Sequence, residues 1–239
     1  MNSAVIQFLE RHRDVLVRED FDSLYASIEP ERVQASEITE ALLDADVNPL
    51  DYLHEIIPFG YAVALPISSI TIPEGFSRID TYAFYECSEL ITAHLPESLI
   101  SIGQEVFSKC TNLSEVNFPD HLSRLGNEAF YECCGLKTIK LPNSLVQIDR
   151  GCFFNCEGLE SATFGDHLES IGEQAFGYCS KLSSLTFPGS LEAISTKAFT
   201  ECDQLEELTF LGSIPPKIVK SAFWNCPIET IYFSGATVT

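Results

Sequence analysis

Basic residues are scarce in this chain of 239 residues, which has 14 Lys and Arg against 35 Asp and Glu and a formal net charge of -21. A surface this acidic repels nucleic-acid phosphates and anionic lipid headgroups. The sequence also lacks an apolar stretch long enough to span a bilayer, and its N-terminus becomes charged at Glu10 and Arg11, too early for a signal-peptide core. We therefore expect no nucleic-acid or membrane partner. We expect a cytoplasmic protein, or an extracellular or cell-surface one if a leader has been removed.

Common catalytic motifs are missing as well. There is no G-x-S-x-G nucleophile turn, no G-x-x-x-x-G-K-[ST] phosphate loop and no H-E-x-x-H metal motif. The cysteines form no pair of C-x-x-C units, which a zinc site would favour. We therefore expect no catalytic residue, no cofactor and no metal site, and we keep an enzymatic or metal-binding protein as a remote alternative.

What the sequence does contain is a repeat of 23 residues, and a fixed period of this size is typical of a solenoid. Phenylalanine precedes each repeat cysteine by three residues, and an aliphatic residue precedes each phenylalanine by five. Six of the seven repeat cysteines are spaced by 23 residues and the last by 24: Cys87, Cys110, Cys133, Cys156, Cys179, Cys202 and Cys226. We interpret them as reduced, structural thiols, because a small side chain with a weak S–H donor suits a crowded turn whose backbone carbonyls need partners.

Each copy also contains a segment in which apolar and polar residues alternate, such as Ile139-Lys140-Leu141, which predicts a half-buried strand. The full pattern, Leu-x-x-Ile-x-Ile-Pro-x-x-Leu-x-x-Ile-Gly-x-x-Ala-Phe-x-x-Cys, resembles the BspA-like or Treponema-type leucine-rich repeats over about residues 51–235. The resemblance implies a right-handed β/α superhelix, mostly β, in which each coil places one strand on a concave sheet with a second short strand and a helical turn behind it.

Two domains are expected from this pattern. Residues 51–239 form a leucine-rich-repeat array of about eight copies, with a degenerate first copy at 51–73 and an irregular last copy at 212–235. Residues 1–50 lack the repeat and show apolar residues at helical spacing, as at Phe21, Leu24, Tyr25 and Ile28. We expect an N-terminal α-helical cap there, and a separate docking module is the alternative.

The sequence gives little support for a metal site built from histidines. Asp120-His121 and Asp166-His167 recur in phase, 46 residues apart (167 − 121), which is two coils. At roughly 4.8 Å per strand the two pairs lie about 10 Å apart, too far to share one metal ion. We interpret both as surface turns.

Two rows of side chains are candidate partner-binding residues. The first is the middle residue of each concave strand, which strand alternation points away from the core. Its members are Thr71, His94, Asn117, Lys140, Thr163, Thr186, Thr209 and Tyr232. The alternative is an aromatic column beside the turn, comprising Tyr85, Tyr131, Phe154 and Trp224. The first row could equally be a solvated strand surface, and aromatics beside a turn more often cover the outer core.

The functional hypothesis is a non-catalytic protein–protein interaction module that binds a protein or peptide, because a solenoid offers an extended surface. Relatives of this type include bacterial surface adhesins and host-binding proteins, so the resemblance implies, as an alternative, an adhesin that binds a host protein or glycan if a leader was removed. The uncovered C-terminal strand edge is a template for strand pairing, so self-association through that edge is a further hypothesis.

Overall fold

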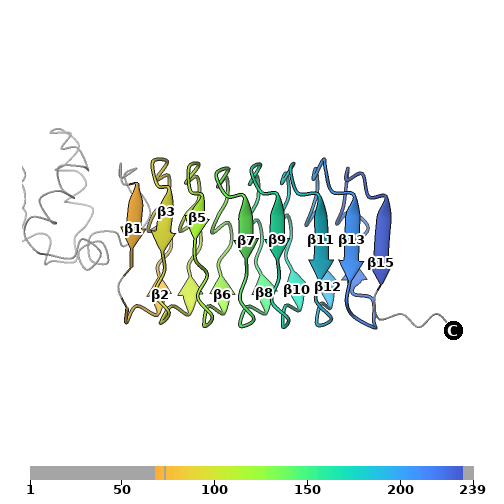
Figure 1. The fold of residues 1–239 in the computed structure, drawn as a ribbon, viewed down its shortest axis with the longest axis horizontal. Helices are drawn as coiled ribbons and strands as arrows, with labels where there is room; N and C mark the ends of the chain where they lie inside the picture. Colours follow the sequence, from red (N-terminus) through yellow and green to blue (C-terminus); the bar gives the residue numbers. More distant parts are fainter. Residues whose placement is uncertain (1–67, 73, 234–239) are drawn as a thin grey trace, which may run out of the picture.

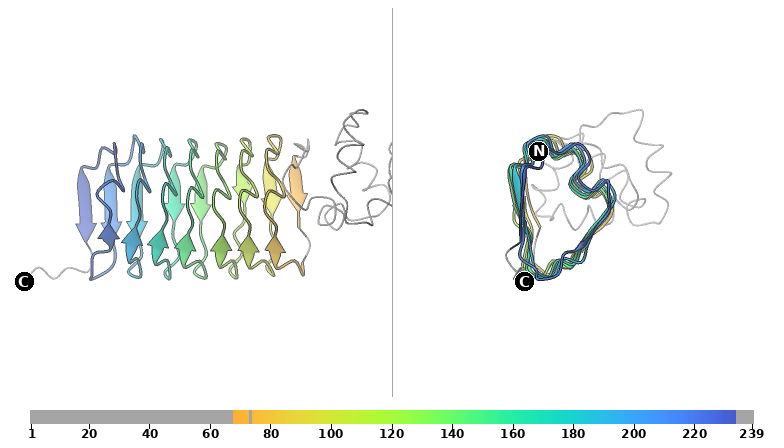
Figure 2. Two further views of the ribbon diagram at one scale, coloured as in Figure 1. Left: turned by 180° about the vertical axis from the view of Figure 1, so that it is seen from behind. Right: turned by 90° about the vertical axis from the view of Figure 1, so that its right-hand side faces the viewer.

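The structure is a computed structural model that describes residues 68–72 and 74–233, and within them the chain forms a β-solenoid (Figure 1). The expected N-terminal cap over residues 1–50 and most of the degenerate first copy lie outside the described residues. Viewed along its axis, each coil has the same closed outline, and successive coils superimpose (Figure 2). The leucine-rich-repeat solenoid predicted from the 23-residue period is therefore confirmed.

The first side of every coil is a strand of two to four residues, and together these strands form what we call the long-strand face. Neighbouring strands are parallel, and where they pair each residue lies opposite the one 23 positions later, as Ser69 does with Thr92. The strands are β1 (Ser69–Thr71), β3 (Thr92–His94), β5 (Glu115–Val116), β7 (Thr138–Lys140), β9 (Ser161–Thr163), β11 (Ser184–Phe187), β13 (Glu207–Phe210) and β15 (Thr230–Phe233). We expected a concave sheet, but this row runs almost straight in Figure 1.

The second side of each coil is a two-residue strand, and these strands pair into one continuous seven-stranded parallel sheet. The first six place an aliphatic residue in the core and a mostly polar residue outside, which is the alternation expected of a half-buried strand, whereas both residues of the last strand are exposed. The strands are β2 (Arg78–Ile79), β4 (Ser101–Ile102), β6 (Arg124–Leu125), β8 (Gln147–Ile148), β10 (Ser170–Ile171), β12 (Ala193–Ile194) and β14 (Lys217–Ile218).

The third side corrects the expected helical turn, because no helix occurs within the described ranges. In the first coil the N–H groups of Tyr82, Phe84 and Glu86 donate to carbonyls of the next coil at 2.8–3.0 Å. The alternating N–H groups donate locally, three residues back. Tyr82 and Glu86 have φ values of 62° and 58°, and the equivalent positions of the following coils are also left-handed, except Ser221 in the last coil. A helix cannot form there because its hydrogen bonds would consume the groups that join the coils.

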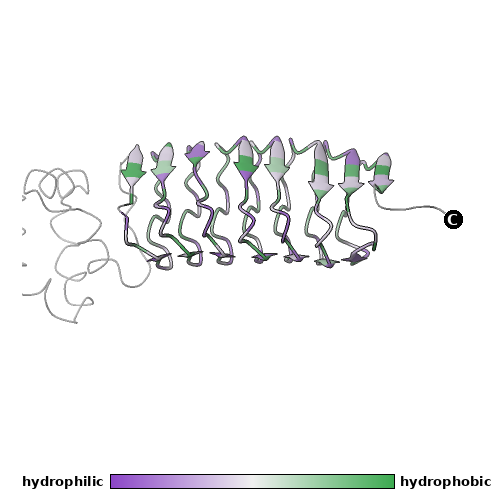
Figure 3. Ribbon diagram, turned by 60° about the horizontal axis from the view of Figure 1, so that its bottom comes forward, coloured by the Kyte–Doolittle hydropathy of each residue, from purple (hydrophilic) through white to green (hydrophobic). Residues whose placement is uncertain are grey.

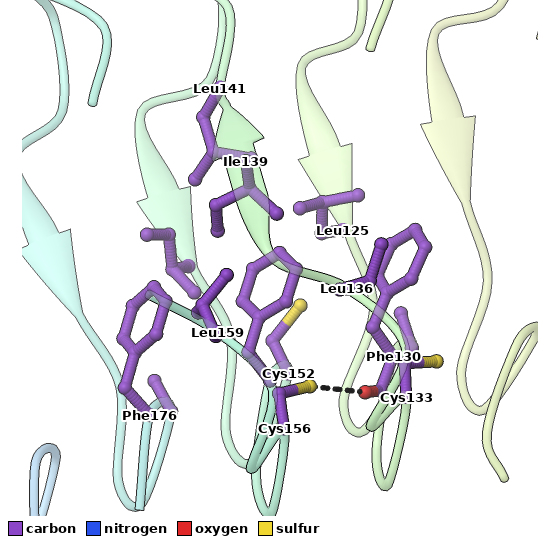
Figure 4. Close-up of a cluster of buried hydrophobic side chains, with 14 of the residues drawn as sticks. Leu125, Phe130, Cys133, Leu136, Ile139, Leu141, Cys152, Cys156, Leu159 and Phe176 are labelled. Carbon is purple, nitrogen blue, oxygen red and sulfur yellow. Dashed lines mark hydrogen bonds between the residues drawn. The ribbon is translucent and has the colours of Figure 1, made fainter. Parts of the chain in front are cut away.

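The core consists of columns in which each side chain packs on its copy in the next coil. Consecutive phenylalanine rings of one column stack with centroids 5.1–5.4 Å apart, as Phe130 does on Phe153. Figure 4 shows leucine and isoleucine side chains packed around this stack. Burying one such Leu, Ile or Phe stabilises the fold by about 1.5 to 3 kcal/mol, and a single coil could not bury them by itself.

The cysteine column confirms the role predicted for it. The Cys156 thiol donates to the Phe130 carbonyl of the preceding coil at 3.1 Å (Figure 4). The same bond recurs from Cys110 to Cys226, with sulfur–oxygen distances of 2.8–3.3 Å. Five of these six carbonyls also accept a local bond from the cysteine N–H of their own coil, at 3.1–3.4 Å, as at 3.3 Å in Phe130. The thiol therefore supplies a donor that the turn lacks.

Candidate binding surface

The predicted row of outward residues lies along the long-strand face. In Figure 3 the long strands show hydrophobic positions between more hydrophilic ones, which is the alternation that turns this row outward. Seven of its eight members are exposed, and Thr209 is half-buried. Among the described residues, the side chains of Lys140, Thr163 and Thr186 form no hydrogen bond or ion pair with another side chain. These groups are not used to hold the fold together, so they are available to a partner.

Asn117 differs from the other members of the row because the fold uses its side chain. Its Nδ2 donates to the Leu95 carbonyl at 2.8 Å, and its Oδ1 accepts from the Leu95 N–H at 2.7 Å. The amide thus imitates a paired strand residue at the place where β5 is only two residues long. Sequence pattern alone placed Asn117 with the binding row, whereas these contacts give it a strand-pairing role.

The long-strand face is interrupted twice, which the sequence did not predict. Its strands pair as β1-β3-β5, β7-β9 and β11-β13-β15, without backbone ladders between the three groups. Figure 1 shows wider spaces between β5 and β7 and between β9 and β11. At these two places the core-facing residues Val116, Phe118 and Ala162 are only half-buried. The β7-β9 pair, which carries Lys140 and Thr163, is therefore flanked by apolar side chains that are accessible from the face.

A second outward row was also missed. The first residue of each long strand points to the same side as the third, because alternate residues share a face. Most members are small hydroxyl residues, and Glu115 and Glu207 interrupt them: Ser69, Thr92, Glu115, Thr138, Ser161, Ser184, Glu207 and Thr230. Strand alternation applied to both ends of each strand would have found this row. The face is therefore two residues wide, polar and mixed in charge.

The alternative aromatic column mostly packs on itself. The Tyr131 and Phe154 rings stack with centroids 5.4 Å apart, and Phe154 also contacts Tyr178 at 5.2 Å. The Phe154 ring lies over Gly177, where an added Cβ would come within 3.0 Å of it. Tyr85 lies under the Lys109 ammonium, 5.2 Å from the ring centroid. Four of these rings thus have part of their surface occupied, whereas Trp224 is 63% exposed.

The thiols and histidines are arranged for structure. Burial raises the pKa of Cys133, Cys152 and Cys156, so these thiols are poor nucleophiles. His121 and His167 are exposed, and the His167 Nδ1 lies 3.1 Å from the Asn143 carbonyl oxygen. Within residues 68–72 and 74–233, no three His, Cys, Asp or Glu side chains gather as metal ligands could. In the same ranges, no helix is long and apolar enough to cross a membrane.

The profile of the BspA type leucine rich repeat region matches six copies, over residues 54–182 and 123–239. These matches cover most of the chain. The chain belongs to the BspA-type leucine-rich repeat family. The fold of this family is typically a binding scaffold for protein interactions, and its repeat accounts for the cysteine, phenylalanine and aliphatic columns described above. No curated protein matches the chain.

The solved structures that resemble this member of the family include two bacterial leucine-rich repeat proteins. A leucine-rich repeat protein of Treponema pallidum is 30% identical, with a TM-score of 0.60 over 64% of this chain and 73% of that one. A leucine-rich repeat protein of Eubacterium ventriosum is 23% identical, with a TM-score of 0.63 over 72% of this chain. The chain spans 46% of the Eubacterium protein, so that comparison concerns the repeat fold alone.

Proposed function

We propose that this chain is a non-catalytic scaffold that binds a protein or peptide across the long-strand face. The observation that carries the proposal is the accessible face itself, with outward side chains that the fold leaves unused beside half-buried core residues. Lys140 and Thr163 lie at its centre, and Val116, Phe118 and Ala162 flank them. Such a mixture of apolar contact and polar specificity is typical of protein interfaces.

The dimensions of the face suit a macromolecule. Eight strands at roughly 4.8 Å span about 34 Å across seven gaps, which matches a protein surface and is too open to enclose a small molecule. Lys140 has no ion pair among the described residues although the chain is strongly acidic. We therefore expect the partner to place an acidic or hydrogen-bond-accepting group near the centre of the face.

A photo-crosslinking residue placed at Thr163 tests the location. The matched control carries the same residue at Gln147, which is exposed on the second sheet in the neighbouring coil. With host and bacterial lysates, we expect one crosslinked species from position 163 and none of that mass from position 147. Equal crosslinking at both positions would count against the long-strand face.

The captured partner, once purified, allows a quantitative test. Thr163→Arg places a large charged group on the face and should weaken binding at least tenfold, whereas Gln147→Arg should leave it unchanged. Single changes of His94, Lys140 and Tyr232 to alanine should each cost roughly 1 kcal/mol or more wherever that residue is an anchor. If these variants all bind like the parent while changes at Tyr85, Tyr131 and Trp224 abolish binding, the aromatic column is the interface.

A further inference from the structure

The last coil exposes residues whose equivalents one coil earlier are fully in the core. Leu208 and Phe210 of β13 are 1% and 3% exposed, but their partners Ile231 and Phe233 of β15 are 51% and 45% exposed. In the second sheet, exposure rises from 0% at Ile194 to 43% at Ile218. The columns of the core therefore end in an open apolar surface. We call this surface, comprising Ile218, Trp224, Ile231 and Phe233, the end face.

Within the described residues, the outer edge of β15 is also not paired with another strand. β15 is one of the longest strands, and it pairs only with β13 within the described part of the chain. Its outer edge presents backbone donors and acceptors that a second strand can use. A binding partner that covers the exposed apolar side chains and pairs a strand with β15 would bury the apolar surface and satisfy the edge hydrogen bonds together.

Charge distinguishes the end face from the rest of the molecule. The chain has 35 Asp and Glu residues, yet only Glu229 falls between residues 208 and 239, where Lys217 and Lys220 also lie. Two copies of a protein with a net charge of -21 repel each other over most of their surfaces. At the end face the carboxylates are largely absent, so two copies can approach there without that cost.

The first described coil does not expose its apolar columns in the same way. The core-facing side chains of the first described coil, Ile70, Ile72 and Ile79, are only 7%, 5% and 5% exposed. Among the described residues, the surface that presents the same columns at the same spacing is the end face of a second copy.

We propose that the chain forms a closed twofold dimer through the end face, with β15 of each copy paired antiparallel to β15 of the other. A twofold axis makes a single patch complementary to itself and leaves no further end to grow from. Phe233 and Ile231 of the two copies pack together, and the edges of the two β15 strands share their hydrogen bonds. This inference is independent of the partner-binding role of the long-strand face.

Light scattering during gel filtration of the full chain tests the proposal. The expected mass is twice the chain mass of 26.5 kDa, or 53.0 kDa (2 × 26.5). Ile231→Asp places a carboxylate on the end face of each copy and should shift the mass to 26.5 kDa. The matched control is Thr163→Asp, which adds the same charge to an exposed strand position in mid-solenoid and should leave the mass at 53.0 kDa.

Hydrogen exchange of the unaltered chain provides a measurement that does not depend on the folding of a variant. Amides of β15 should exchange slowly at high protein concentration and faster on dilution, while those of β9 should not change. A parent chain that stays monomeric at high concentration would overturn the proposal. So would a dimer that survives Ile231→Asp with concentration-independent exchange in β15, or an assembly that keeps growing beyond two copies.

Discussion

The left-handed residues of the third side allow the sign of a stability change to be predicted at two adjacent positions. Gln174 has φ 55°, whereas its neighbour Glu173 is not in the left-handed region. Both side chains lie at the surface, and within the described part of the chain neither forms a hydrogen bond or ion pair with another side chain. Changing each residue to glycine and to alanine compares the same two side chains in opposite backbone conformations.

The magnitude follows from two opposing terms. A Cβ in the left-handed region costs roughly 1–2 kcal/mol, and glycine costs roughly 0.5–1 kcal/mol of extra backbone entropy on folding. At position 174 glycine should therefore be more stable than alanine by about 0.5–1 kcal/mol. At position 173 only the entropy cost applies, so alanine should be more stable than glycine by about 0.5–1 kcal/mol. Gly151, which occupies the position of Gln174 one coil earlier with φ 59°, is the natural precedent.

Urea unfolding followed by circular dichroism measures the four variants, and unchanged slopes would show that the same unfolding transition is compared. Gly151→Ala should be destabilising, and its added Cβ would also meet the Glu128 side chain at 2.9 Å, which can move aside. The reasoning would be refuted if glycine and alanine rank in the same order at positions 173 and 174.

Four further outcomes are expected. Alkylation of the denatured, unreduced chain should modify all nine cysteines, and a mass short by several alkyl groups would show disulfides. In the native chain Cys226 should react before a buried thiol such as Cys133, because its hydrogen bond with the neighbouring thiol lowers the pKa of Cys226, whereas burial raises the pKa of Cys133. Gly158→Ala should destabilise the fold by about 1–3 kcal/mol, since the new Cβ would overlap a backbone carbonyl of the preceding coil. Gly189→Ala, whose Cβ would make an ordinary contact at 3.5 Å, should change unfolding by less than about 0.5 kcal/mol. Asn117→Asp should cost about 1–3 kcal/mol in thermal or urea unfolding because a carboxylate cannot donate to the Leu95 carbonyl, and an unchanged midpoint would contradict its pairing role.

The solenoid and its columns could be predicted from the sequence because residues that are one repeat period apart contact each other in neighbouring coils. When one residue type returns every 23 positions, stacking coils places each copy on the next, as the Phe130–Phe153 pair shows. The same logic predicted that Ile139 and Leu141 face inward and Lys140 outward. It also predicted the use of the cysteine thiol, since a repeated small donor implies a repeated carbonyl that needs one.

The conformation of the third side could not be predicted in the same way. Left-handed positions are usually occupied by glycine or asparagine. Here the positions equivalent to Tyr82 and Glu86 hold mainly glutamate, lysine and tyrosine, such as Glu132 and Lys197. The two left-handed positions of a coil lie four residues apart, as Tyr82 and Glu86 do, and this spacing is also that of one helical turn. Only the neighbouring coil, whose carbonyls accept the inter-coil hydrogen bonds, makes the left-handed conformation favourable enough to offset its local cost.

The sequence by itself therefore determined the repeat, the inward and outward faces and the candidate row on the long-strand face. Tertiary structure alone decided that this face is split into three groups, that Asn117 pairs strands and that Ile231 and Phe233 are exposed. The physical reason is that periodicity specifies what each coil shares with the next. Hydrogen bonds between particular coils, and the exposure of core-facing residues in the last described coil, depend on how the whole stack is assembled.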